Sequence, residues 1–368
     1  MKAAVWHNRL DIRVEEFPDP PAPRDDEITI KVSWCGICGT DVEEYLYGPL
    51  FIPVGIPNPM TGRMAPMVMG HEFVGTVAAV GRAVTDLKIG DVVAPDTLIH
   101  CGTCYWCQRH EVHRCEKLAI LGLTTDGGLA EYVNAPRYMC FKLPPGIPEH
   151  VGALAEPASV GVRANRRGRT GPGDIVCVVG AGAVGLFCLQ VARVCGASQV
   201  YMVETQANRL AVAGQMGATA VFNPLNVDPV EAIKQVTGGR GADVVIEAGG
   251  VEKTMLLAPH LARKGGRVVF LGQHNEPAPF NFFPLVTNEW ELIGSFSHIY
   301  DEDFSAAVAF LGDGRINGEP LITGRIRLDD LVEKGLKQLV EHKSENLKIL
   351  VSPQLPLGQQ AGQDARSC

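Results

Sequence analysis

The chain reads IVCVVGAGAVG from Ile175 to Gly185, a short apolar run that passes directly into closely spaced glycines. The apolar residues 175–179 are typical of a strand that is buried on both faces, and a helical pattern follows from about residue 183. Further apolar strands are predicted at 199–204, 243–248, 267–272 and 291–294, with helical stretches between them. This alternation predicts an α/β fold with a doubly wound parallel sheet.

The glycine spacing after the first strand predicts a dinucleotide-binding loop. Gly180 allows the tight turn, Gly182 lets the backbone approach a pyrophosphate, and Gly185 permits close packing of helix on strand. Val184 lies in the same loop, and the helix start offers free N–H groups to the phosphates. The alternative is a glycine-rich turn with a purely structural role.

An acidic residue favours NAD over NADP. Glu204 ends the second predicted strand, 19 positions after Gly185, where a carboxylate would accept hydrogen bonds from ribose hydroxyls and repel a 2′-phosphate. Arg209, shortly after it, is a further candidate for cofactor binding.

Four cysteines are packed into fifteen residues, with the pattern Cys101-x2-Cys104-x2-Cys107-x7-Cys115. Four thiolates form a closed tetrahedral shell around zinc, so we expect a structural zinc ion. An iron–sulfur cluster or loosely buried cysteines are the alternatives, because spacing alone excludes neither.

The net charge and the hydropathy of the chain limit the classes of partner that it can have. The net charge of −8 argues against a nucleic acid or an anionic membrane as the main partner. No uncharged apolar run reaches the roughly 20 residues that a membrane helix needs, and the first residues do not resemble a signal peptide. We therefore expect a cytoplasmic protein with a small-molecule substrate.

Two short motifs stand in the strand-rich N-terminal part, Cys38-Gly39-Thr40-Asp41 and Gly70-His71-Glu72. They are 33 residues apart, as counted from Cys38 to His71, and neither alone would indicate a metal site. A cysteine before a turn is usually buried, and a single histidine is more often structural. Only in combination with the other motifs do they indicate a metal site.

Over about residues 1–352 the chain resembles the zinc-containing medium-chain alcohol dehydrogenases. The motifs that carry the resemblance are CGICGTD (35–41), GHE (70–72), the cysteine quartet, GDVV (90–93), EP (156–157) and the glycine-rich loop. Within this family it is most similar to the (R,R)-2,3-butanediol dehydrogenases, through GPLFIPV (48–54) and APMVMGHEF (65–73). Sorbitol and threonine dehydrogenases share the motifs more distantly.

The resemblance implies a second, catalytic zinc ion and hydride transfer between an alcohol and NAD. Cys38 and His71 would bind this zinc, with Glu72 and Glu156 as acidic ligands or near-ligands. Three protein ligands leave one position open for an alcohol oxygen, and the metal acts as a Lewis acid.

The resemblance also implies a proton path. Thr40 would contact the substrate oxygen, unless it is merely a turn hydroxyl, and Asp41 would orient His71. Butanediol dehydrogenases typically carry a histidine three residues after this threonine, whereas this chain has Glu43. The relay is therefore expected to use Glu43, His298 or water.

For the nicotinamide, the resemblance implicates Leu271, Gly272, Ser295 and Phe296. It further implies a strand-rich, GroES-like catalytic domain from residues 1–158 and 297–352, and a Rossmann cofactor domain from 159–296. Residues 353–368 are expected to form a flexible tail, and the chain to assemble as a homodimer or homotetramer.

Three functions remain open on the sequence. The first is an NAD-dependent dehydrogenase of a secondary alcohol or vicinal diol such as 2,3-butanediol. The second is a polyol (sorbitol-like) or L-threonine 3-dehydrogenase with the same machinery. The third, from a different class, is a non-catalytic protein that binds zinc and a dinucleotide.

Overall fold

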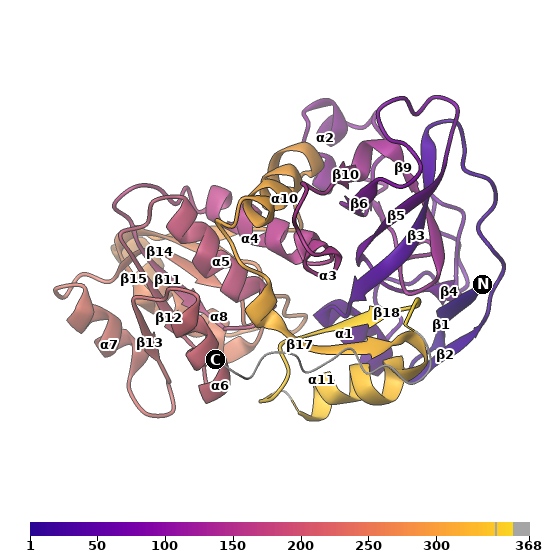
Figure 1. Ribbon diagram of the computed structural model, residues 1–368. Helices are drawn as coiled ribbons and strands as arrows, with labels where there is room; N and C mark the ends of the chain where they lie inside the picture. The colour runs from indigo at the N-terminus through magenta and orange to yellow at the C-terminus, as the bar shows by residue number, and fades with distance from the viewer. Residues whose placement is uncertain (343, 356–368) are drawn as a thin grey trace. The chain divides into compact units, whose positions relative to one another are not determined.

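The computed structural model describes residues 1–342 and 344–355, which form two compact units (Figure 1). The first contains residues 1–156, 299–301, 322–342 and 344–355. The second contains residues 157–298 and 302–321. Each unit is described by itself below.

The second unit is built on a six-stranded sheet in which every neighbouring pair is parallel. The strand order is β13-β12-β11-β14-β15-β16. The strands are β11 (Ile175–Val179), β12 (Gln199–Val203), β13 (Ala220–Phe222), β14 (Ala242–Glu247), β15 (Ala262–Phe270) and β16 (Glu291–Gly294). The helices of this unit include α5 (Ala183–Val194), α6 (Ala207–Gln215), α7 (Pro229–Val236), α8 (Glu252–Leu261), α9 (Phe282–Thr287) and α10 (Ser305–Gly312). Figure 1 shows helices α5 to α8 alternating with these strands.

The central strand explains this architecture. All five residues of β11 are buried, because helices cover both faces of a parallel sheet and no position faces water. The predicted doubly wound fold is confirmed. The sequence reading missed β13, whose three residues are too few for a periodic pattern to be recognised.

The first unit is rich in antiparallel strands. Its main sheet has the order β10-β6-β5-β3-β18-β17, with β9 also paired to β3. These strands are β3 (Glu27–Gly36), β5 (Glu72–Val80), β6 (Val92–Pro95), β9 (Tyr132–Pro136), β10 (Cys140–Lys142), β17 (Ile322–Arg327) and β18 (Lys348–Ser352). Two smaller sheets contain β1 (Lys2–Asn8), β2 (Asp11–Glu16) and β4 (Met67–Val68), and β7 (Leu98–Ile99) and β8 (Ala119–Ile120). The helices are α1 (Gly39–Tyr47), α2 (Tyr105–Gln108), α3 (Glu149–Gly152), α11 (Lys337–Glu341) and the start of α4 (Ala155–Arg167).

Strand β3 positions the functional residues of this unit. It pairs with β5 along its length, and its last residue, Gly36, lies opposite Glu72. Its C-terminal end also pairs with β18, where Val351 lies opposite Cys35. The ends of three strands, distant in sequence, therefore meet beside the start of α1.

The two units divide the chain differently from the expected domains, since residues 157–158, 297–298 and 302–321 all fall into the second unit. Residues 302–321 fall into the second unit, although they were expected in the catalytic domain. The amide of Gln190 exchanges hydrogen bonds of 2.7 and 3.2 Å with the backbone of Asn317. Arg166 pairs with the buried Asp303 at 3.0 Å. These contacts attach the segment to α5 and α4 rather than to the strand-rich unit.

The remaining expectations concern the chain end and membranes. Strand β18 ends at Ser352, and of the expected tail only residues 353–355 lie within the described part. Among the described residues, no helix combines the length and apolar character needed to cross a bilayer.

Candidate metal centres and cofactor site

Three predicted ligands converge in the first unit. Cys38 is the N-cap of α1, and His71 and Glu72 stand at the start of β5. One ligand atom from each lies within 4.8 Å of the others. His71 and Glu72 are buried, whereas Cys38 is partly exposed. A thiolate, an imidazole and a carboxylate are the donors that zinc takes in catalytic sites, and the residues fit that ion.

Asp41 stabilises this group in two ways. Its Oδ2 accepts the backbone N–H of Cys38 at 2.8 Å, which closes the first turn of α1. Its Oδ1 lies 3.6 Å from Nδ1 of His71, which places a negative charge beside the imidazole. Burial lowers the pKa of His71, but Asp41 and Cys38 outweigh this and raise the pKa well above its usual value.

Glu72 has a partner that the sequence reading missed. Nζ of Lys348, the first residue of β18, lies 2.6 and 2.8 Å from the two carboxylate oxygens of Glu72. A lysine that begins an apolar strand gives no sign of a buried ion pair with a residue 276 positions away. Only the pairing of both strands with β3 brings the two together.

The other residues expected around the catalytic metal are placed as follows. Glu156 is the second residue of α4 and lies outside the group whose ligand atoms converge. The hydroxyl of Thr40 lies 3.7 Å from Sγ of Cys38. Glu43 is partly buried on α1, one turn after Thr40 and on the same face. Burial raises the pKa of Glu43, and so does the neighbouring Glu44.

Glu44 has a structural function that its sequence position did not reveal. Its side chain is fully buried and accepts backbone N–H groups from Leu50, Phe51 and Ile52. Its carbonyl accepts the indole N–H of Trp6 at 3.2 Å. The helix that carries Cys38 thus also fixes the start of the proline-rich loop after it.

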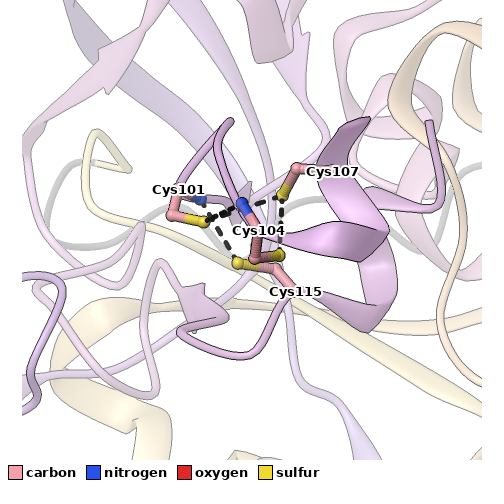
Figure 2. A group of neighbouring side chains, drawn as sticks. All are labelled: Cys101, Cys104, Cys107 and Cys115. Carbon is pink, nitrogen blue, oxygen red and sulfur yellow. Dashed lines mark hydrogen bonds between the residues drawn. The ribbon is translucent and has the colours of Figure 1, made fainter. Parts of the chain in front are cut away.

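The cysteine quartet forms the second metal centre (Figure 2). The sulfur atoms of Cys104 and Cys107 are 3.5 Å apart, and those of Cys101 and Cys107 are 3.9 Å apart. A tetrahedral shell with Zn–S bonds near 2.3 Å places its sulfurs about 3.8 Å apart. The four thiols therefore have the spacing that one zinc ion requires.

Backbone groups around the quartet favour thiolates. The N–H of Cys104 donates to Sγ of Cys101 at 3.3 Å, and the N–H of Lys117 donates to Sγ of Cys115 at 3.4 Å. The backbone N–H groups of Thr103 and Cys104 lower the pKa of Cys101 to about 6. Burial instead raises the pKa of Cys107 to about 12.

In the second unit the glycine-rich loop has the expected geometry. Gly180 has a φ of 98°, a left-handed conformation that favours glycine. A Cβ at Gly185 would collide with the carbonyl oxygen of Gly180, whereas a Cβ at Gly182 would meet no protein atom within 4 Å. The partly buried Val184 is in the first turn of α5. The loop is therefore tight on the sheet side and open where phosphates would lie.

Glu204 connects this loop to the end of β12. Its Oε2 accepts the N–H of Ala181 at 2.9 Å, and its Oε1 accepts the N–H groups of Thr205 and Gln206 at 2.6 and 2.9 Å. Burial lowers the pKa of Arg209, while the nearby Glu204 acts in the opposite direction. The acid expected at the cofactor thus acts electrostatically on the arginine expected there.

The residues expected at the nicotinamide follow β15 and β16. The N–H groups of Leu271 and Gly272 both donate to the carbonyl of Glu247, at 3.0 and 3.2 Å. The N–H of Ser295 donates to Phe270 at 2.9 Å, and Phe296 is 46% exposed.

Glu247, which the sequence reading did not select, organises these turns. It is fully buried at the end of β14, and its Oε1 accepts the N–H groups of Gly249 and Gly250 at 2.8 and 2.9 Å. One residue thus ties the turn after β14 to the turn after β15.

Comparison with known proteins is consistent with this geometry. Residues 24–145 match the family model of the alcohol dehydrogenase GroES-like domain, and residues 183–313 match that of the zinc-binding dehydrogenases. The (R,R)-butanediol dehydrogenase of Bacillus subtilis (strain 168) is 37% identical over 96% of this chain and 100% of its own length. The sorbitol dehydrogenase of the same organism is 32% identical over 96% and 97%, respectively.

Solved structures that resemble this chain are also dehydrogenases of this kind. The crystal structure of 2R,3R-butanediol dehydrogenase from Bacillus subtilis is 35% identical and has a TM-score of 0.88 over 96% of this chain and 99% of that one. A protein from Sinorhizobium meliloti 1021, solved bound to NADP, is 32% identical with a TM-score of 0.84 over 96% and 99%. The chain therefore belongs to the zinc-dependent alcohol dehydrogenase family and is a medium-chain oxidoreductase.

Proposed function

We propose that this protein is an NAD-dependent dehydrogenase that interconverts a secondary alcohol or vicinal diol, such as 2,3-butanediol, and the corresponding ketone. The observation that carries the proposal is the convergence of Cys38, His71 and Glu72 in a family member. The similarity to (R,R)-butanediol dehydrogenases over nearly the full length supports a diol as substrate.

The residues of the first unit have separate tasks in this reaction. Cys38 and His71, with Glu72 and Glu156 as acidic members, would hold the catalytic zinc, which when bound supplies a Lewis acid that favours deprotonation of an alcohol. The hydroxyl of Thr40 accepts the hydroxyl proton of the substrate while it releases its own proton toward Glu43. Glu43, on the same face of α1, receives it and passes it to solvent.

The proposal includes two zinc ions per chain. The second is held by the quartet Cys101, Cys104, Cys107 and Cys115, whose four thiolates leave no position for a substrate. Its function is to fix the loop from residue 101 to 115.

The cofactor is proposed to be NAD rather than NADP. Gly180, Gly182, Val184 and Gly185 would receive the pyrophosphate, and the carboxylate of Glu204 would disfavour a 2′-phosphate. One similar protein was solved bound to NADP, so the preference must be measured for this chain.

The test is NADH absorbance at about neutral pH with a panel of 2,3-butanediol stereoisomers, acetoin, sorbitol, xylitol and L-threonine. We expect the highest kcat/KM for a butanediol stereoisomer, loss of activity with a chelator, and recovery with zinc. Cys38→Ser should lose activity and one zinc equivalent, whereas Cys177→Ala, a buried thiol of the other unit, should keep both. Turnover that is unchanged in Cys38→Ser would contradict the proposal.

A polyol is the second candidate substrate, and the similarity to sorbitol dehydrogenase favours it over L-threonine. Higher kcat/KM for sorbitol or xylitol than for every butanediol would establish it instead. A non-catalytic role is disfavoured, since the family's metal ligands and cofactor loop are all present.

We further propose a homodimer or homotetramer that forms through the edge of the six-stranded sheet. Strand β16 has a partner on one side only in the described part of the chain. Exposed apolar side chains occur on this strand, on α9 before it and just after it: Phe282, Phe283, Val286, Leu292 and Phe296. Phe283→Glu should reduce the mass measured by light scattering, and Leu225→Glu, at an equally exposed leucine after β13, should not.

A further inference from the structure

Lys348 is almost completely buried beside the proposed catalytic metal. Its side chain is 5% exposed and that of its partner, Glu72, is 1% exposed. Nζ donates to Oε2 and Oε1 of Glu72 at 2.6 and 2.8 Å and to the carbonyl of Ile37 at 3.0 Å. An ammonium group has three donors, and all three are used within this group.

The fold makes room for this contact through a glycine. Strand β3 lies between β5, which begins with Glu72, and β18, which begins with Lys348. A Cβ at Gly36 would collide with Oε2 of Glu72. The absence of a side chain at this position lets the carboxylate lie across β3 and meet the lysine.

The same carboxylate lies within ligand distance of the metal donors. An oxygen of Glu72 is within 4.8 Å of the ligand atoms of Cys38 and His71. Both of its oxygens are nevertheless engaged by Lys348. Burial lowers the pKa of Lys348, but the charges of Glu72, Cys38 and Glu156 act in the opposite direction and raise it.

The charges explain why a lysine is needed here. Cys38 as thiolate, Asp41, Glu72 and Glu156 carry four negative charges, and a zinc ion offsets two. The ammonium of Lys348 offsets the charge of Glu72, whereas Asp41 lies beside His71. Without Lys348, the free carboxylate of Glu72 would be a buried anion whose nearest available cation is the metal.

We propose that Lys348 is a positioning residue that holds Glu72 away from permanent metal coordination and so keeps a coordination position accessible to the substrate. This inference rests on the proposed function, because it presumes that the metal binds at Cys38 and His71. Of the two acidic members proposed above, Glu72 then reaches the metal only transiently, and Glu156, which lies outside the converging group, is proposed as the lasting acidic ligand.

The test uses full-length protein whose zinc has been replaced by Co²⁺, with imidazole as the probe of an accessible position. The visible spectrum of Cys38→Ser is subtracted to remove the contribution of the quartet. Wild type should change its Co²⁺ spectrum on addition of imidazole. In Lys348→Met the released Glu72 should bind the metal, so the change should be lost and Co²⁺ should dissociate about tenfold more slowly.

Three further variants separate positioning from simple stabilisation. Lys348→Met combined with Glu72→Gln removes both charges and should recover the response to imidazole, whereas a purely structural defect would persist. Lys348→Arg keeps the charge and should behave as wild type. Glu72→Gln alone, which can be measured even if Lys348→Met does not fold, should change Co²⁺ affinity less than about threefold.

The outcomes are distinguishable. If wild type and Cys38→Ser bind equal amounts of metal, the proposed function fails. If wild type binds metal at Cys38 but Lys348→Met responds to imidazole as wild type does, only the positioning role fails. A tenfold or greater loss of Co²⁺ affinity in Glu72→Gln would also overturn it, because Glu72 would then be a resting ligand.

Discussion

Oδ1 of Asp41 lies 3.6 Å from Nδ1 of His71, and Oδ2 of the same carboxylate accepts the backbone N–H of Cys38 at 2.8 Å. A single buried side chain therefore orients two proposed zinc ligands from different elements. The helix cap and the orientation of the imidazole are not independent features of the site.

Asp41→Asn should separate these two functions. The amide oxygen can still accept the N–H of Cys38, but the negative charge opposite His71 is lost. We expect the affinity for zinc to fall about 10–100-fold, which is typical for partners of metal-bound histidines. Competition with a chromophoric chelator measures it, and Glu341→Gln, at an exposed acid of the same unit, is the control. Equal zinc retention in Asp41→Asn and wild type would contradict the role.

After removal of zinc, the four thiols of the quartet should react with an alkylating agent in a defined order. Cys101, whose pKa is lowered to about 6 by backbone N–H groups of Thr103 and Cys104, is mostly thiolate at about pH 7. Cys107, with a pKa raised to about 12 by burial, remains a thiol. Iodoacetamide should therefore label Cys101 first, as followed by peptide mass spectrometry, and zinc should suppress the labelling. Preferential labelling of Cys107 would show that the order is wrong.

Glu43 is expected to set one limb of the pH–rate profile. A proton acceptor must be ionised, so kcat should fall as the pH decreases through the pKa of Glu43. Because burial and Glu44 raise this pKa, the fall should begin at a higher pH than for an ordinary glutamate. Glu43→Gln should lose the limb, and Glu341→Gln should keep it. Superimposable profiles of Glu43→Gln and wild type would exclude Glu43 from the relay.

Two neighbouring glycines should respond differently to the same substitution. Gly185→Ala places a methyl group against the carbonyl of Gly180 and should destabilise the protein by about 1–3 kcal/mol, measured by urea unfolding. Gly182→Ala meets no protein atom, so unfolding should be nearly unchanged. NADH binding, followed by fluorescence, should still weaken in Gly182→Ala, because the methyl group points to the side of the phosphates. Normal NADH affinity in Gly182→Ala would place the pyrophosphate elsewhere.

Glu204→Ala should relax the choice between the two cofactors. Loss of hydrogen bonds to a charged carboxylate should reduce the kcat/KM ratio of NAD to NADP about tenfold or more. Part of the loss should affect both cofactors, since Oε2 of Glu204 also accepts the N–H of Ala181 in the glycine-rich loop. Glu204→Gln, which retains an acceptor for Ala181, isolates the effect of charge. An unchanged ratio in both variants would contradict the assignment.

Features encoded within short stretches were predictable from the sequence. The strand, loop and helix around Gly180–Gly185 and the quartet between Cys101 and Cys115 depend on residues within a few turns of one another. Cys38 and His71 were identified through the family motifs, since a separation of 33 positions hides their proximity from any local pattern.

The tertiary structure alone decided the environment of the catalytic group. Glu72 and Lys348 meet only because β5 and β18 both flank β3, and Gly36 leaves space between them. Segment 302–321 joins the cofactor unit through contacts to Gln190 and Arg166 that no periodicity reveals. Neighbouring residues determine local backbone conformation, whereas strand pairing across the whole chain determines which buried polar groups become partners.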